Sequence, residues 1–186
     1  MGRIVVTEFI SVDGVVEDPG GAEDFKYGGW TFEFNRGDEG DNFKLEETRE
    51  SDALLLGRLT YQGFAEAWPS REGEFADLFN NMPKYVVSST LSDPEWTNST
   101  VIDGDLAAEV SKVKDRHDGN IVVHGSPTLV KALLDQDLVD ELRLMVFPVV
   151  LGAGKQLFGE SDKKALKLAD SKTVGDGVAI LVYQRA

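Results

Sequence analysis

The sequence predicts an α/β protein with a central mixed, mostly parallel sheet, flanked by helices and ending in an antiparallel β meander. Strand-like and helix-like segments alternate over the first two thirds of the 186 residues. The last third carries strand patterns without helices between them. No internal repeat, low-complexity tract or linker divides the chain. We therefore expect a single domain over residues 1–186.

The strands are predicted from short apolar runs rich in β-branched residues. In chain order they cover residues 3–10, 53–56, 84–88, 100–102, 121–123, 141–150, 166–172 and 178–184. The last two resemble an antiparallel pair joined by a turn at 174–177.

Helices are expected at residues 41–51, 60–67, 105–116 and 128–134. The clearest is 105–116, where Leu106, Val110 and Val113 recur about one turn apart. Residues 11–21 form a loop. Residues 25–40 mix aromatic side chains with glycine and give no clear assignment.

Composition excludes several classes of function. With 19 basic and 33 acidic residues the net charge is -14, which opposes binding to nucleic acid or to an anionic membrane surface. There is no cysteine, and only two histidines are present, so we expect no disulfide, no thiolate chemistry and no metal site. No apolar run approaches the roughly 20 residues of a membrane span. The lack of cysteine and of a signal peptide fits the cytoplasm.

One strand end carries a helix-start signal. After His124, Gly125 permits a sharp turn, Ser126 suits the N-cap, Pro127 suits the first helical position, and Thr128 follows. Free N–H groups at such a start favour phosphate. Read alone, this stretch is better interpreted as a capped helix with nothing bound.

Two further strand ends have the same design. Gly57 and Arg58 end one strand, and Thr60 can cap the next helix. Arginine suits phosphate because its planar fork makes paired, charge-assisted hydrogen bonds. Ser88, Ser89 and Thr90 place hydroxyl groups at a third strand end. Because open α/β sheets bind ligands beyond the carboxyl ends of their strands, three such ends together favour a nucleotide site.

A fourth stretch, Gly152-Ala153-Gly154, offers two glycines of a dinucleotide fingerprint but not the third, since Leu157 stands there. A glycine-rich bulge close to a ligand fits it better than a Rossmann motif.

The motifs GRLTY, VVSSTL, HGSPTLVKALL and LVDELRLMVFPVVLGAGKQLF, with the opening IVVTEFISVDGVV, resemble the dihydrofolate reductase-like superfamily. The similarity is closest to the reductase domain of bacterial riboflavin biosynthesis and covers nearly the whole chain. It implies a three-layer fold that binds NADPH and reduces a pyrimidine or pterin-like heterocycle. The named possibilities are 5-amino-6-(5-phosphoribosylamino)uracil reductase and dihydrofolate reductase.

The resemblance also implies roles for individual residues. Arg58 and Ser89 would hold the adenosine 2′-phosphate. The remaining cofactor candidates are helix starts, a hydroxyl and the glycine-rich bulge: Gly57, Thr60, Ser88, Gly125, Ser126, Thr128, Gly152 and Gly154. Asp13 and Gly14 lie in the loop that would close over nicotinamide and substrate, where Asp13 would position or protonate the substrate.

Dihydrofolate reductases carry an acidic residue on the first helix that binds the pterin ring. The candidates here leave the choice open, and for most of them a solvated surface is the better interpretation: Glu33, Asp38, Glu39, Asp41, Glu46 and Glu47. Trp30 and Phe32 are candidate apolar walls for a planar substrate. His124 is expected to be structural, with a minor acid–base candidacy. The lack of cysteine also argues against the zinc deaminase domain that usually accompanies the riboflavin reductase, which weakens the link to that pathway.

The sequence is therefore consistent with two functions. The first is an NADPH-dependent reductase, and the second is a non-catalytic NADPH-binding sensor or partner-binding module on the same fold. The resemblance also implies a homodimer, for which the apolar strand at residues 142–150 offers a surface.

Overall fold

The computed structural model describes residues 1–186 and contains one eight-stranded sheet, in the order β4-β3-β2-β5-β1-β6-β8-β7. The strands are β1 (Arg3–Ser11), β2 (Ser51–Gly57), β3 (Lys84–Val87), β4 (Ser99–Ile102), β5 (Asn120–His124), β6 (Glu141–Phe147), β7 (Leu166–Val174) and β8 (Val178–Arg185). The first six pair in parallel, and β8 runs antiparallel to both β6 and β7. This confirms the predicted mixed, mostly parallel sheet with its antiparallel end.

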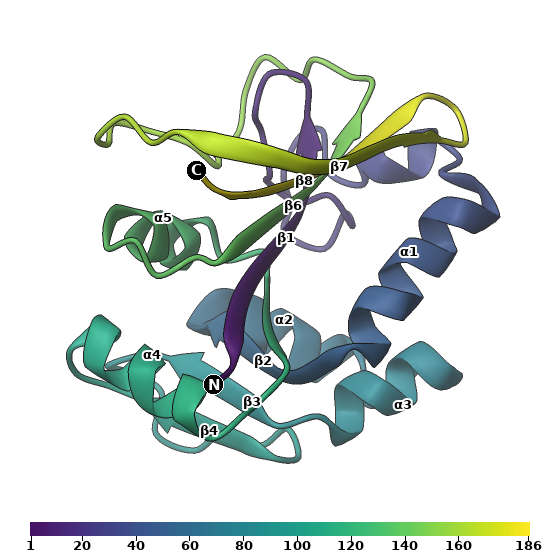
Figure 1. Cartoon of the computed structure of the whole chain (residues 1–186). Coiled ribbons are helices and arrows are strands. Elements are labelled where there is room, and N and C mark those ends of the chain that lie inside the picture. Colours follow the sequence, from purple (N-terminus) through teal and green to yellow (C-terminus); the bar gives the residue numbers. More distant parts are fainter.

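Helices cover both faces of the sheet, which gives three layers (Figure 1). They are α1 (Gly37–Arg49), α2 (Arg58–Ala67), α3 (Glu74–Asn81), α4 (Leu106–Asp115) and α5 (Pro127–Asp135), with a short 3-10 helix η1 (Trp30–Glu33). In Figure 1, α4 and α5 lie on one side of the sheet, and α1 and α3 lie on the other. The turn of the β7–β8 hairpin lies beside the N-terminal end of α1 (Figure 1).

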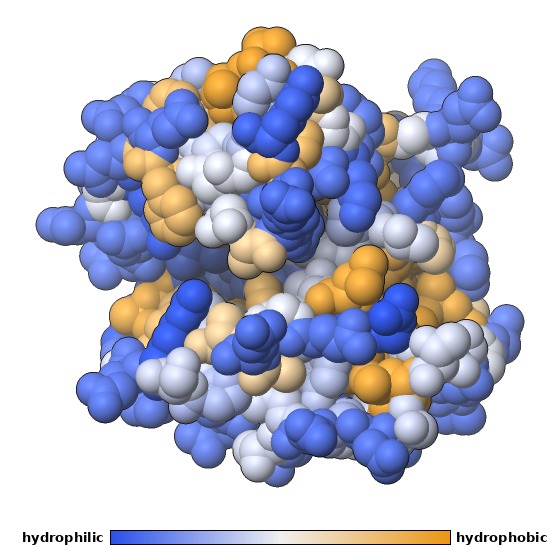
Figure 2. Space-filling view, turned by 180° about the vertical axis from the view of Figure 1, so that it is seen from behind, coloured by the Kyte–Doolittle hydropathy of each residue, from blue (hydrophilic) through white to orange (hydrophobic).

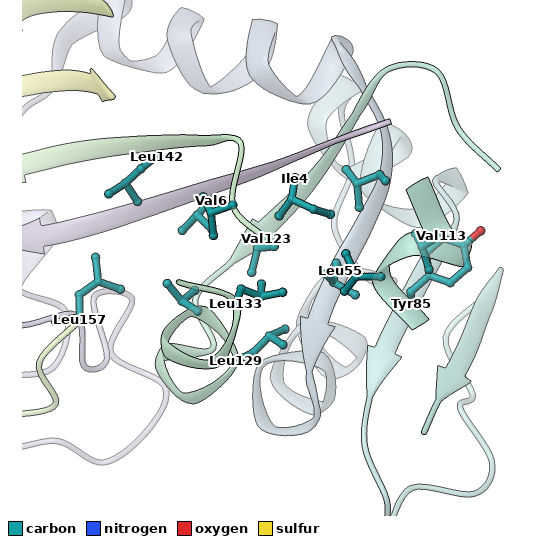
Figure 3. Packing of buried hydrophobic residues seen from close by; sticks show 14 of the residues in the cluster. Ile4, Val6, Leu55, Tyr85, Val113, Val123, Leu129, Leu133, Leu142 and Leu157 are labelled. Atoms are coloured by element: carbon teal, nitrogen blue, oxygen red, sulfur yellow. The ribbon is translucent and has the colours of Figure 1, made fainter. Parts of the chain in front are cut away.

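The main core lies under α4 and α5 and contains nineteen buried residues. In Figure 3, Ile4 and Val6 of β1 and Val123 of β5 point toward Leu129 and Leu133 of α5. Alternate residues of β1 and β5 face the other way, because side chains alternate along a strand. Val5 and Val122 accordingly pack in a second core with residues of α2 and α3.

Several predicted boundaries are corrected. Helix α2 begins at Arg58 with Gly57 as its N-cap, so Thr60 lies inside the helix and is not its cap. Strand β6 ends at Phe147, because Pro148 cannot continue the ladder. The expected helix at 41–51 is α1 and begins earlier, at Gly37. Its Gly40 packs so closely that a Cβ there would lie 3.3 Å from Val174 Cγ2, and this packing overrides the poor helix propensity of glycine.

Two elements were not predicted. η1 lies in the unassigned stretch 25–40, and α3 follows α2 where no helix was expected. α3 is held by packing of Phe75 and Phe79 against Trp68, with ring centroids 5.2 and 4.9 Å away. These contacts join α3 to Trp68, the C-cap of α2, so the apolar periodicity of α3 alone does not reveal them.

Hydrophilic residues dominate the surface seen in Figure 2, where hydrophobic residues form separate small patches. None of the helices combines the length and the apolar character that crossing a membrane requires. No cluster of three or more acidic or histidine side chains with metal-binding geometry is present.

Candidate functional site

Four parallel strands end at one edge of the sheet, in the spatial order β3, β2, β5, β1. The residues singled out from the sequence follow these ends: Ser88 and Ser89 after β3, Arg58 after β2, Gly125 and Ser126 after β5, and Asp13 after β1. The structure therefore brings the three phosphate-compatible motifs together, side by side, at the edge where α/β sheets bind ligands.

The turns before α2 and α5 are fastened to each other. The Gly57 N–H donates to Ser126 Oγ at 2.9 Å, and the Ser126 N–H donates to Thr60 Oγ1 at 3.0 Å. Ser126 occupies the N-cap position of α5, as predicted, but its side chain makes no capping bond to the helix. Its hydroxyl instead links the two turns. Ser126 and Thr60, both predicted to cap helices, therefore hold the two turns together.

This contact also explains the two glycines. A Cβ on Gly57 would lie 3.0 Å from Ser126 Oγ, and one on Gly125 would lie 3.1 Å from Thr60 Oγ1. Gly125 and Ser126 both have left-handed backbone, with φ of 55° and 57°. For serine that conformation costs free energy, and the two hydrogen bonds around it compensate.

Several polar groups at this edge remain available for a ligand. Arg58 is exposed, with only a 3.2 Å contact from Nη1 to Gln62 Oε1, and Ser89 is exposed as well. In the first turn of α5, Pro127 has no N–H, and the N–H groups of Thr128 and Leu129 have no acceptor in the protein, since bonding to the preceding turn begins with Val130. Guanidinium and helix-start N–H groups are the donors that phosphate prefers.

Ser88 has a structural role in the turn after β3. Its Oγ accepts the N–H groups of Thr90 at 3.2 Å and Leu91 at 3.1 Å. The hydroxyl group of the neighbouring Ser89 is exposed and makes no hydrogen bond within the protein.

Asp13 fastens the loop after β1 to the loop after β6. Its carboxylate accepts the N–H groups of Leu151 at 3.1 Å and Gly152 at 2.8 Å, and the Ser11 hydroxyl at 2.6 Å. The Ser11 hydroxyl, followed by the two N–H groups, lowers the pKa of Asp13 to about 2. The group is thus ionised at neutral pH, which favours positioning over proton donation.

Gly14 and Gly154 lie where the same two loops approach each other. The Leu157 N–H donates to Gly14 O at 3.0 Å, and a Cβ on Gly154 would lie 2.6 Å from Val15 Cγ1. The glycine-rich bulge therefore packs on the loop after β1. Its approach to a nicotinamide ring remains a prediction.

The two aromatic candidates differ in exposure. Trp30 is 1% exposed, donates its indole N–H to Glu17 O at 2.8 Å and meets Phe147 edge-on at 5.6 Å. Phe32 is 80% exposed on the same short helix. A substrate-contacting role for either ring remains a prediction.

A buried ionic cluster lies between α1 and the sheet, formed by Thr7, Lys44, Glu47 and Arg143. Lys44 Nζ donates to Thr7 Oγ1 at 2.8 Å and to Glu47 Oε1 at 2.5 Å. Arg143 Nη1 lies 3.4 Å from Glu47 Oε2, and Arg143 Nε donates to Glu141 at 2.7 Å. We call Thr7, Lys44, Glu47 and Arg143 the α1–sheet cluster.

The cluster distinguishes among the acidic candidates on and before the first helix. Glu47 is 2% exposed, whereas the other five lie in exposed positions. Sequence reasoning did not single out Thr7, Lys44 or Arg143. The available signal was a polar residue inside an apolar strand, as at Thr7 in β1 and Arg143 in β6.

Charge pairing sets the protonation states in this region. Burial alone would raise the pKa of Glu47, but Lys44 and Arg143 outweigh it, and the pKa is lowered. His124 ends β5 beside Phe79, with ring centroids 5.1 Å apart. Burial, assisted by Lys44, lowers the pKa of His124 to about 3, so the imidazole is neutral at neutral pH.

The sheet opens beside this cluster. Pairing of β1 with β5 ends at Thr7 and His124, whereas pairing of β1 with β6 continues to Ser11 and Phe147. One side of β1 therefore loses its neighbour beyond Thr7, and the Gly125–Ser126 turn lies across the opening. A planar group entering from the strand-end edge would meet β1 here.

The chain is similar to several known proteins. It is 28% identical to YyaP of Bacillus subtilis (strain 168) over 187 residues, covering 97% of this chain and 94% of that protein. The crystal structure of a putative riboflavin biosynthesis protein from Shewanella sp. PV-4 matches with a TM-score of 0.80, 21% identity and 99% coverage of both chains. Dihydrofolate reductase from Enterococcus faecalis, complexed with NADP(H) and RAB-propyl, matches with a TM-score of 0.60 and 18% identity over 99% of this chain and 96% of that one.

These structural matches show the shared dihydrofolate reductase-like fold. At the level of sequence, the family model described as the RibD C-terminal domain matches residues 3–180. The chain therefore belongs to the RibD C-terminal domain family, which confirms the resemblance inferred from its motifs.

Proposed function

We propose that the protein is a cytoplasmic oxidoreductase that uses NADPH to reduce a planar pyrimidine or pterin-like heterocycle. The proposal rests on the order of the strand ends: phosphate-compatible groups follow β3, β2 and β5, and the next strand, β1, contributes Thr7 to the buried α1–sheet cluster. This row matches a dinucleotide that lies along the edge with its ring end at β1.

The donor set fits NADPH. Arg58 and Ser89, on neighbouring strand ends, would hold the 2′-phosphate, and the free N–H groups of Thr128 and Leu129 would face the pyrophosphate. Bound NADPH supplies the hydride. The protein's part is to orient the two rings and to exclude water.

The substrate would lie between α1 and β1, against the α1–sheet cluster. Arg143 uses its Nε and Nη1 in ion pairs, so further guanidinium N–H groups are free to donate. Glu47, held ionised by its partners, is the acceptor. Donors beside a carboxylate match a ring that carries both a carbonyl oxygen and an N–H group.

The assay for this function is oxidation of NADPH, followed by the absorbance of the reduced nicotinamide, with a panel of pyrimidines and pterins. Turnover with at least one of them is the expected result. Tight NADPH binding without oxidation across a broad panel would instead support the non-catalytic sensor.

For Asp13 we predict that Asp13→Asn lowers turnover at least tenfold while NADPH still binds, because the loop that it fastens would cover the ring end of the proposed site. Turnover rate and NADPH affinity are measured on the same preparation. Unchanged turnover on the true substrate would remove Asp13 from the site.

A further inference from the structure

Glu8 is an acidic residue in the apolar part of β1. Its neighbours at two residues' distance, Val6 and Ile10, belong to the core under α4 and α5. Glu8 shares their face of the sheet because side chains alternate along a strand. Figure 3 shows that this face of β1, at Val6, looks toward α5. In the neighbouring strand β6, the residue paired with Glu8 is Leu144.

The Glu8 carboxyl has no partner in the protein. The residue is 5% exposed, and its Oε1 is fully buried without a hydrogen bond. Burying a polar group without a hydrogen bond costs free energy, so such groups are rare in native proteins and gather at functional sites.

The protonation state of Glu8 follows from this burial. Burial raises its pKa to about 8, although the charge of Lys44 opposes the shift. At neutral pH the carboxyl is therefore mostly protonated, and it carries an O–H that can donate a hydrogen bond.

Charged groups on the elements around β1 make their own contacts, and none of them pairs with Glu8. They are Lys44 on α1, Arg143 and Glu141 on β6, Lys131 and Asp135 on α5, and Asp13 and Glu17 in the loop after β1. The groups on α1 and β6 pair with one another on the opposite face, the α5 pair is at the surface, and the loop carboxylates accept backbone N–H groups. The imidazole of His124 on β5 is neutral.

Glu8 also lies at the opening in the sheet. Thr7 is the last residue of β1 paired with β5, so the position that would pair with Glu8 is Gly125, where the chain turns into α5. The carboxyl thus belongs to the strip of β1 that faces the start of α5. In the proposed row of strand ends, this strip is where the ring end of the dinucleotide arrives.

We propose that Glu8 binds the nicotinamide end of the dinucleotide as a protonated carboxylic acid, which donates a hydrogen bond to the carboxamide oxygen. The proposal rests on the function proposed above and adds a residue that recognises the ring. It makes NADPH binding depend on one proton held by the protein.

The test is calorimetric titration with NADPH between pH 7 and 9.5, which lies above the titration range of the cofactor's phosphates. The wild-type affinity should weaken by about tenfold or more between pH 8 and pH 9.5, because the ionised carboxylate both lacks the donor and repels the carboxamide oxygen. Glu8→Gln, whose amide still donates, should bind within a few-fold of wild type at pH 7 and keep that affinity to pH 9.5. Glu8→Leu should bind roughly five- to tenfold more weakly at pH 7, the usual effect of losing one hydrogen bond.

Glu66→Gln is the matched control, because Glu66 is exposed on α2, and it should follow the wild-type curve. Near-ultraviolet circular dichroism checks that each variant is folded, and Glu8→Gln decides the test if Glu8→Leu is not. Wild-type affinity that is flat with pH, or a Glu8→Gln curve as steep as the wild type, overturns this inference alone. Absence of NADPH binding at every pH overturns the proposed function and this inference with it.

Discussion

Two carboxyl groups on the same short stretch of chain have pKa values shifted in opposite directions by their surroundings. Asp13 accepts three hydrogen bonds at the open edge, and its pKa falls to about 2. Glu8 is buried among apolar side chains, and its pKa rises to about 8. Each pKa shift reflects the protonation state that the folded protein stabilises, and each makes the free energy of unfolding depend on pH.

For Glu8 the consequence is a loss of stability as pH rises. The folded pKa lies above the unfolded value, so the contribution is fully present below about pH 4.5 and is lost as pH rises through about 8. We predict that Glu8→Gln, measured by urea unfolding, exceeds the wild type in stability by roughly 4 kcal/mol more at pH 8 than at pH 4. Parallel pH profiles for the two proteins would contradict this prediction.

Arg58 is predicted to decide which nicotinamide cofactor is used. Its guanidinium is exposed and pairs with no acidic residue, so it is free to bind the 2′-phosphate. Arg58→Ala should raise the Kd for NADPH about 10- to 100-fold and change that for NADH little, because a charge-assisted contact contributes roughly 1.5–3 kcal/mol. Arg116→Ala, at the far end of α4, is the control and should have no effect. An unchanged preference in Arg58→Ala would show that the phosphate is bound elsewhere.

Among the elements, those with strong local patterns were predictable from the sequence. The helix α4 has its apolar residues one turn apart, and Asp105 caps it by accepting the Ala108 N–H at 2.9 Å. The β7–β8 hairpin likewise follows from two strand patterns around a glycine turn. By contrast, α1 begins with two glycines within four residues, and only its packing on the sheet and hairpin explains where it starts.

The site was predictable to a similar extent. Strand-end turns at Gly57 and Gly125 carry their signal locally, so their meeting at one edge follows from the topology of parallel sheets. The α1–sheet cluster carries no such signal, because Glu47 and Arg143 are 96 residues apart in the chain and meet only when the sheet has formed. The contact between the two turns was missed for the same reason.

That contact between turns can be tested with a pair of glycine substitutions. Gly57 has an ordinary φ of -75°, so Gly57→Ala strains the approach to Ser126, whose Oγ and Cβ would lie 3.0 and 3.1 Å from the new Cβ. We predict that it destabilises the protein by about 1–3 kcal/mol in chemical denaturation. Gly63→Ala is the control. A Cβ there meets nothing within 4 Å, and helix propensity predicts up to ~1 kcal/mol of stabilisation. Equal changes in the free energy of unfolding for both substitutions would show that the two turns move apart without cost.

At the scale of the whole molecule, the sheet order determines which surfaces are free. β6 lies between β1 and β8 and is largely buried, so within the stretch 142–150 the exposed large apolar side chain is Val150, which lies beyond the strand. Two exposed apolar residues lie on the edge strand β7: Leu166 is 42% and Leu168 49% exposed. Leu168 is paired with the partly buried Tyr183 of β8 on the same face.

We propose that a second copy of the chain covers this β7–β8 face. The expected result is a particle of about twice 20.4 kDa in light scattering, and Leu168→Asp should convert it to the monomer. Leu59→Asp, which changes another exposed leucine on α2, should leave the mass unchanged. A wild-type protein that is monomeric at all concentrations would exclude the dimer.

The central place of β1 has a consequence for synthesis on the ribosome. This strand is made before its partners, residues 120–124 and 141–147, so it has no neighbour while more than a hundred residues are added. An apolar, β-branched segment in that state is prone to pair with the same segment of another chain. In the unfolded nascent chain Glu8 has its ordinary acidity and is ionised, which puts a negative charge in the middle of the waiting strand. We therefore expect the residue that the folded protein holds neutral to oppose aggregation of the nascent chain until β5 and β6 have been made.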